Sequence, residues 1–140
     1  MSRSIPEKIR LAVAERAEFR CEYCLMHESD LVVGAHIDHI ISIKHGGRSM
    51  LQNLAYSCLI CNVNKGSDIA TMLLPSEKPV RFFNPRKDKW ADHFDLVDAS
   101  ILPKTEIGSA TVKILDLNAL ERVLRRRLLV LSGRYPLNWK

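Results

Sequence analysis

Cys21-Glu22-Tyr23-Cys24 and Cys58-Leu59-Ile60-Cys61 are the two stretches of sequence that decide the fold of this chain. Each is a C-x-x-C pair, and together they hold all four cysteines of the 140-residue sequence. A C-x-x-C pair forms a tight knuckle turn that presents two sulfurs to one point, so two pairs can close a tetrahedral zinc site. We therefore predict that Cys21, Cys24, Cys58 and Cys61 bind one structural zinc ion.

Two other interpretations of the cysteines explain less of the sequence. A disulfide framework needs an oxidising compartment, but the polar start of the chain, Met1 to Glu7, is not followed by the apolar segment of a signal peptide. A thioredoxin-like redox role for one pair leaves the second pair unexplained. We therefore expect a cytoplasmic protein with reduced cysteines. The zinc ion is expected to stabilise the segment, and it does not indicate what the segment does.

The polar residues between and beside the cysteines are suited to phosphodiester hydrolysis. That reaction needs a nucleophile, neutralisation of the phosphate charge and help for the leaving oxygen. Histidine is the natural base near neutral pH, and carboxylate and amide oxygens are ligands for Mg²⁺ or Mn²⁺. The order Asp38-His39, Asn53, then Asn62 directly after the last cysteine resembles the HNH endonuclease family, in its His-Asn-Asn form with a four-cysteine zinc site.

The resemblance implies a role for each matching residue. His39 is expected to be the general base that activates water, and Asn53 to brace the loop and orient that base. Asp38 and Asn62 are expected to hold the catalytic cation, and this oxygen ligand pair favours Mg²⁺ or Mn²⁺ over Ni²⁺ or Zn²⁺. Lys65, one helical turn after Asn62, is expected to contact phosphate.

The predicted fold class is α+β, with a ββα-metal core, an N-terminal helix and a C-terminal α/β extension. The β-branched segment 35–43 predicts the first strand, 55–57 a second, and the second knuckle a short helix ending at Gly66. Neighbouring side chains of a regular strand point to opposite faces, so a bend or a strand end must re-aim Asp38 or His39.

The chain after the core carries weaker signals. We expect the N-terminal helix and nuclease core within 1–75, and an extension packed on this core within 76–140. A helix is predicted to end at Pro75, and strands at 95–101 and 110–115. A basic amphipathic helix is predicted to follow Asn118, with its apolar face formed by Leu120, Val123, Leu124, Leu128 and Leu131.

The charge of the chain favours a nucleic-acid partner. The net charge is +5 and the pI is near 9.2. We expect DNA as the substrate, with phosphate contacts from Arg48 in the glycine loop and from Arg86 and Lys87. The competing hypothesis is a zinc-stabilised binding module without catalysis, although a carboxylate aimed at phosphate would then repel it.

Two further expectations concern assembly and membranes. No apolar run in the sequence approaches the length needed to cross a bilayer, so we expect no membrane partner. A single such centre cuts one strand, so a double-strand break would require a homodimer or two nicking events.

Overall fold

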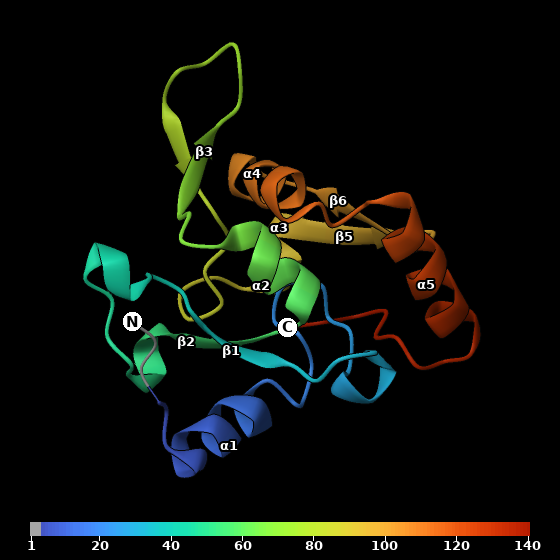
Figure 1. Cartoon of the computed structure of the whole chain (residues 1–140). Coiled ribbons are helices and arrows are strands. Elements are labelled where there is room, and N and C mark those ends of the chain that lie inside the picture. Colours follow the sequence, from blue (N-terminus) through green and yellow to red (C-terminus); the bar gives the residue numbers. More distant parts are fainter. Residues whose placement is uncertain (1–3) are drawn as a thin grey trace.

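A two-stranded antiparallel sheet followed by a helix forms the centre of the fold, in a computed structural model that describes residues 4–140 (Figure 1). Strand β1 (His36–His39) pairs with β2 (Leu54–Ser57), and helix α2 (Leu59–Lys65) follows the second strand directly. The two knuckles lie before β1 and at the start of α2. The predicted α+β class with a ββα unit is therefore confirmed.

The register of this sheet separates the two motif residues of β1. Asp38 lies opposite Ala55 and His39 opposite Leu54. Asp38 is only 4% exposed, whereas His39 is half-buried and is the last residue of the strand. Because side chains alternate along a strand, Asp38 faces the interior and His39 leaves from the strand end into the following loop.

Helix α1 (Glu7–Arg16) covers the sheet through a small core of its own. The apolar side chains of that core come from the helix, its flanks and β2: Ile5, Val13, Ala14, Ala17, Leu54 and Tyr56. Arg16, at the end of the helix, donates hydrogen bonds to the carbonyl oxygens of Leu51 (2.8 Å) and Leu54 (2.5 Å). The N-terminal helix therefore supports β2 and the turn that leads into it.

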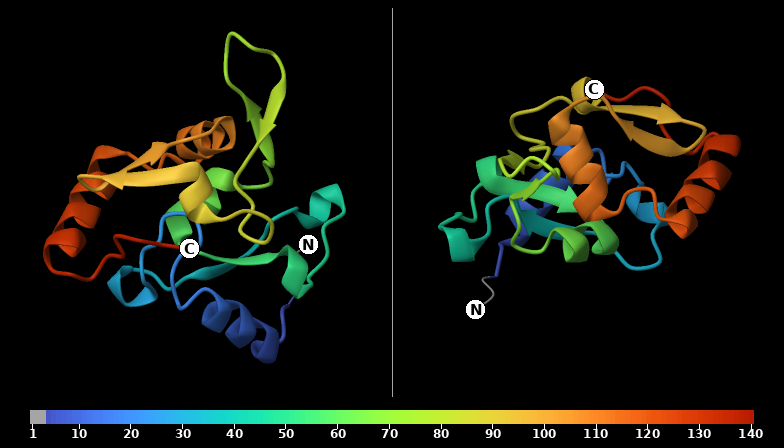
Figure 2. Two further views of the ribbon diagram at one scale, coloured as in Figure 1. Left: turned by 180° about the vertical axis from the view of Figure 1, so that it is seen from behind. Right: turned by 90° about the horizontal axis from the view of Figure 1, so that it is seen from above.

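The remaining elements are short helices and hairpins. Three 3₁₀ helices lie between the knuckles: Glu28–Asp30, Ile43–His45 and Leu51–Asn53. Beyond α2 come β3 (Ala70–Met72), β4 (Pro79–Arg81), α3 (Trp90–His93), β5 (Phe94–Val97), β6 (Ser100–Pro103), α4 (Glu106–Leu115) and α5 (Leu120–Leu131). Strands β3 and β4 form one antiparallel hairpin, and β5 and β6 form another (Figures 1 and 2).

Two predictions about this region are wrong. The segment before Pro75 is strand β3 of a hairpin and not a helix, and 110–115 lies in helix α4 and not in a strand. The helix begins where the Thr105 hydroxyl accepts a hydrogen bond from the Gly108 N–H at 3.0 Å. This N-cap, together with packing of α4 on both hairpins, outweighs the strand preference of the β-branched residues.

The predicted strand at 95–101 is instead a tight hairpin. Asp98 and Ala99 both have positive φ, as the two central residues of a type I′ turn do, and they join β5 to β6. The helix predicted after Asn118 is α5, but the four leucines of its predicted apolar face are exposed, and Arg126 is buried instead. The guanidinium of Arg126 donates to Ala99 O at 2.8 Å and to Asn118 Oδ1 at 3.0 Å.

The main core contains side chains from both sides of residue 75. The buried cysteines pack with apolar residues of the later segment: Phe82, Phe83, Trp90, Phe94, Ile101, Leu115 and Tyr135. Trp90 Nε1 donates to Tyr23 O at 3.0 Å, and the Tyr135 hydroxyl donates to Cys24 O at 2.5 Å. The extension therefore closes over the first knuckle. Within residues 4–140, no helix combines the length and apolar character needed to span a membrane.

Candidate active site and metal centre

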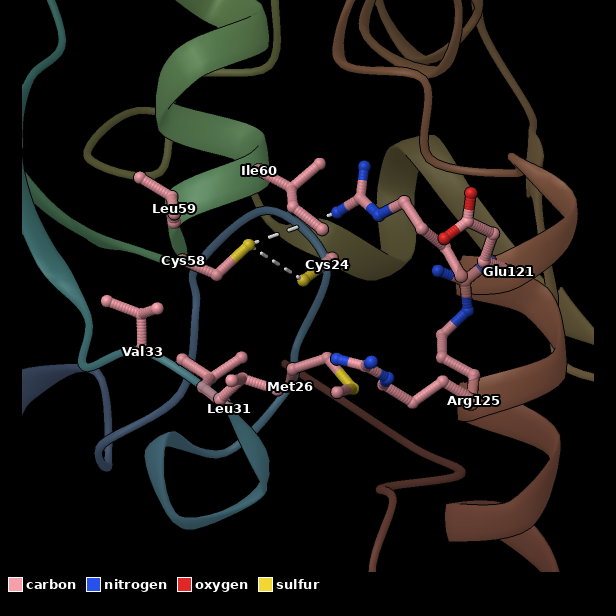
Figure 3. Close-up of a pocket in the computed structure, with 12 residues that line it drawn as sticks. Cys24, Met26, Leu31, Val33, Cys58, Leu59, Ile60, Glu121 and Arg125 are labelled. Atoms are coloured by element: carbon pink, nitrogen blue, oxygen red, sulfur yellow. Dashed lines mark hydrogen bonds between the residues drawn. The ribbon is translucent and has the colours of Figure 1, made fainter.

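The four cysteine side chains converge on one buried point, and their sulfur atoms all lie within 4.8 Å of one another. In each knuckle the N–H of the second cysteine points at the first sulfur, at 3.5 Å for Cys24 and 3.4 Å for Cys61. The sulfurs of Cys24 and Cys58 are 3.7 Å apart (Figure 3). A tetrahedral zinc site with Zn–S bonds of about 2.3 Å would separate two sulfurs by about 3.8 Å. The cluster thus has the donor set and spacing of a metal site.

Arg122 of α5 supplies positive charge to this cluster. Its guanidinium lies 3.0 Å from Cys61 Sγ and 3.9 Å from Cys58 Sγ. Burial opposes the charge of Arg122, but the neighbouring thiolates outweigh burial and raise the pKa of the guanidinium. Hydrogen bonds from the other three thiols lower the pKa of Cys24, and the charge of Arg122 acts in the same direction. Burial raises the pKa of Cys21 and Cys61, so it is the charge of Arg122 that favours the thiolate in this cluster, the form that binds metal.

A separate open pocket of about 390 Å³ lies over β1 and α2. Asp38, His39 and Asn62 line it, together with Ser42 and Lys44. Within residues 4–140, the Asn62 side chain has no hydrogen-bond partner, and the hydroxyl of Ser42 is buried without one. A carboxylate and a free amide oxygen on one lining form the hard-oxygen set that Mg²⁺ or Mn²⁺ prefers. The donor types of this pocket therefore fit a divalent cation.

His39 also lines this pocket. Its Nε2 is 2.8 Å from the hydroxyl of Ser49, which comes from the loop between β1 and β2. This hydrogen bond fixes the orientation of the imidazole ring through Nε2. Nδ1 is then the ring nitrogen that can interact with another partner. The orientation of His39 thus depends on the conformation of that loop.

Asn53 holds the same loop closed. Its Oδ1 accepts from the Ile41 N–H at 2.9 Å, and its Nδ2 donates to Ile41 O at 2.8 Å and to Arg48 O at 2.9 Å. Gly47 lies against this brace, because a Cβ at position 47 would be 1.7 Å from Ile41 O and 2.8 Å from Asn53 Nδ2. These bonds hold the loop that carries Ser49, and none of the three reaches His39 itself.

Asp38 is held inside the fold. Its Oδ2 accepts from the Tyr23 hydroxyl at 2.9 Å and lies 3.2 Å from the Lys65 ammonium. Burial raises the pKa of Asp38, while Lys65 and the Tyr23 hydrogen bond oppose that rise. The cation and the hydroxyl beside this buried carboxylate offset the free-energy cost of removing its charge from water.

The four predicted nucleic-acid contacts differ in accessibility. Arg48 and Lys87 are exposed. Lys65 is 2% exposed, and its ammonium bonds to protein oxygens. Arg86 is ion-paired with Glu22 and donates to Leu54 O at 2.8 Å. Lys65 and Arg86 therefore have structural partners within the fold, in contrast to the phosphate contacts expected of them.

Several site residues were not predicted from the sequence. Ser42, Lys44 and Ser49 lie in the glycine-rich loop region, where the predicted nucleic-acid contact is Arg48. Tyr23 stands in the sequence as an intervening residue of the knuckle. Its contact with Asp38 is predictable in principle, because a buried tyrosine hydroxyl needs a hydrogen-bond partner and Asp38 is the acidic residue of the motif.

Comparison with known proteins agrees with this geometry. Residues 21–68 match the family model for HNH endonuclease. This segment is an HNH endonuclease domain. Over 124 residues the chain is also 26% identical to the Septu protein PtuB of Bacillus thuringiensis, a match that covers 87% of this chain and 46% of that protein. The chain thus spans about half the length of this curated relative. No solved structure matched the chain. The HNH domain contains all four cysteines, the whole β1–β2–α2 unit and the pocket above it.

Proposed function

We propose that this HNH protein is a metal-dependent DNA endonuclease that hydrolyses phosphodiester bonds. The observation that carries the proposal is the joint presence of Asp38, His39 and Asn62 in the lining of one open pocket of the HNH domain. The four-cysteine cluster would hold a structural zinc ion, and Asp38 and Asn62 would hold Mg²⁺ or Mn²⁺. A reducing, cytoplasmic setting suits four unpaired thiols.

The residues of the pocket have complementary tasks in this mechanism. His39, turned by the Ser49 hydroxyl at its Nε2, would accept a proton from water at Nδ1. Asn53 would maintain the loop in which Ser49 lies. A divalent cation bound beside them supplies charge neutralisation at the phosphate and at the leaving oxygen. The resemblance to HNH enzymes implies 5′-phosphate and 3′-hydroxyl products.

The charge of the surface supports a polyanionic substrate. The chain carries a net charge of +5, and Arg48, Lys44 and Lys87 are exposed cations. Lys44 lines the pocket itself. Cations at such positions attract the phosphate backbone without reading base sequence. The proposed substrate is therefore DNA bound through its backbone near the pocket.

Cleavage of supercoiled plasmid tests this proposal. We expect nicked circles with Mg²⁺ or Mn²⁺, intact plasmid with EDTA, and a loss of roughly 10²- to 10⁴-fold in His39→Ala, because a general base contributes about that factor. His27→Ala is the matched control, since the His27 ring also bonds a serine hydroxyl, at 2.9 Å, but lies outside the pocket.

The outcome decides between the two candidate classes. Nicking that disappears in His39→Ala and persists in His27→Ala supports the endonuclease and excludes a contaminating nuclease. DNA binding by wild-type protein without cleavage under any of these metals would favour the zinc-stabilised binding module instead.

A further inference from the structure

The Asp38 carboxylate has two oxygens in unequal surroundings. Its Oδ2 accepts from the Tyr23 hydroxyl at 2.9 Å and lies 3.2 Å from Lys65 Nζ. Its Oδ1 accepts a hydrogen bond of 3.4 Å from the same ammonium and has no other hydrogen-bond partner among residues 4–140. Since Asp38 is almost fully buried, its side chain cannot rotate without breaking these bonds. The Tyr23 hydroxyl thus engages Oδ2 alone, whereas Lys65 contacts both oxygens, and Oδ1, with this one long hydrogen bond, keeps a lone pair for another partner.

Lys65 connects this carboxylate to the rest of the active site. Its ammonium donates to the carbonyl oxygens of His39, at 3.2 Å, and Ile40, at 3.0 Å. It is also the last residue of α2, the helix that carries Asn62. One buried ammonium therefore joins the proposed metal ligand, the backbone of the proposed base and the helix of the second ligand.

Tyr23 connects the carboxylate to the cysteine cluster. It lies between Cys21 and Cys24 in the first knuckle, and its backbone oxygen accepts from Trp90 Nε1 at 3.0 Å. The cysteines on either side and the hydrogen bond from Trp90 therefore hold the backbone of Tyr23, and with it the ring, in place. The hydroxyl of that ring then fixes Asp38.

We infer that Tyr23, which engages Asp38 Oδ2, and Lys65, which holds the carboxylate between its two oxygens, are positioning residues that present Oδ1 as a single-oxygen ligand to the catalytic cation. This inference rests on the proposed function, because it assigns a partner role at the same site. It also gives the cysteine cluster a task in catalysis: its first knuckle carries one of the two groups that aim the ligand. Groups that hydrogen-bond a metal ligand commonly change metal affinity by 10- to 100-fold when removed.

The test is Mn²⁺ binding to zinc-loaded protein, followed by the electron paramagnetic resonance signal of free Mn²⁺. We expect Tyr23→Phe to bind Mn²⁺ roughly 10-fold more weakly than wild type, and its nicking rate to recover as Mn²⁺ is raised. Tyr56→Phe is the matched control, because the Tyr56 hydroxyl also donates to a carboxylate, Glu28 Oε1 at 2.5 Å, but lies outside the pocket. It should bind Mn²⁺ as wild type does.

Lys65→Met provides a second, independent test. Removal of a positive charge beside a carboxylate should strengthen cation binding on Coulombic grounds alone. Weaker Mn²⁺ binding in Lys65→Met therefore supports positioning, and unchanged or tighter binding overturns the role of Lys65. Zinc content and melting temperature establish that each variant is folded.

The results separate this inference from the proposed nuclease. Wild-type affinity for Mn²⁺ in Tyr23→Phe would refute the positioning role while leaving plasmid cleavage intact. Wild-type protein that binds Mn²⁺ but does not nick plasmid would refute the nuclease, and the Mn²⁺ affinities of the variants would still decide whether Asp38 is positioned in this way.

Discussion

Arg122→Met should weaken the hold of the cysteine cluster on zinc. The Arg122 guanidinium donates to Cys61 Sγ at 3.0 Å and to Leu115 O at 2.7 Å, so it joins α5 and the end of α4 to the cluster. A hydrogen bond to a charged group contributes about 1.5–3 kcal/mol. Because tenfold in affinity corresponds to about 1.4 kcal/mol, loss of the bond to sulfur should lower zinc affinity roughly 10- to 100-fold, in line with other groups that support metal ligands.

The assay is competition for zinc with a coloured chelator, applied to wild type, Arg122→Met and Arg125→Met. Arg125 is the control because it lies on the same helix and lines the same pocket beside the cysteines, yet within residues 4–140 it has no hydrogen bond to sulfur (Figure 3). Methionine replaces the apolar stem of both side chains and removes the guanidinium. Equal zinc affinity in Arg122→Met and wild type would refute the argument that this guanidinium stabilises the thiolates.

Three other predictions concern the loop, the pH response and the metal. Gly47→Ala should destabilise the fold by about 1–3 kcal/mol and reduce nicking, because its Cβ would collide with Ile41 O and displace Asn53. Urea unfolding measures the change in stability, and plasmid cleavage measures the change in nicking. An unchanged unfolding midpoint would contradict the collision. Hydrogen bonds from Arg81 lower the pKa of Asp88, so the stability they give is present above the ordinary aspartate pKa of about 3.9 and is lost as pH falls through the lower, folded-state value. In Asp88→Asn, unfolding curves recorded from pH 7 to pH 2 should show a smaller loss in that acidic window, and an equal loss would exclude Asp88 as a source. Removal of zinc by a chelator should lower the melting temperature in one cooperative transition, since the cysteines lie in the core shared by both parts of the chain; two separate transitions by calorimetry would contradict this.

The ββα unit was predictable because its signals are local. Cysteine spacing, the Asp38-His39 pair and Gly66 as the end of a helix are each read within a few residues, and a metal cluster requires its two knuckles to meet. Helix α4 was not predictable in this way. Its sequence from Ala110 to Leu115 contains β-branched residues typical of strands, and its helical form depends on the Thr105 cap and on packing against distant hairpins.

The candidate site shows the same division. Asp38, His39 and Asn62 could be predicted from the motif. Ser42 and Lys44, which line the same pocket, could not, and neither could the partners that surround them. Lys65 and Arg126 look like solvent-exposed cations in the sequence, and both are buried with oxygen partners from distant segments. Burial of a charge depends on the partner that compensates it, and that partner is brought close only by the tertiary fold.

The order of residues along the chain has a consequence for synthesis on the ribosome. The last cysteine is Cys61, whereas the groups that close over the cluster, Trp90, Arg122 and Tyr135, are translated afterwards. Thiols able to capture zinc therefore leave the exit tunnel before the arginine that favours their thiolate form. During synthesis the ligand set is therefore complete before its support is, and only the arrival of α5 places a guanidinium beside Cys61 Sγ.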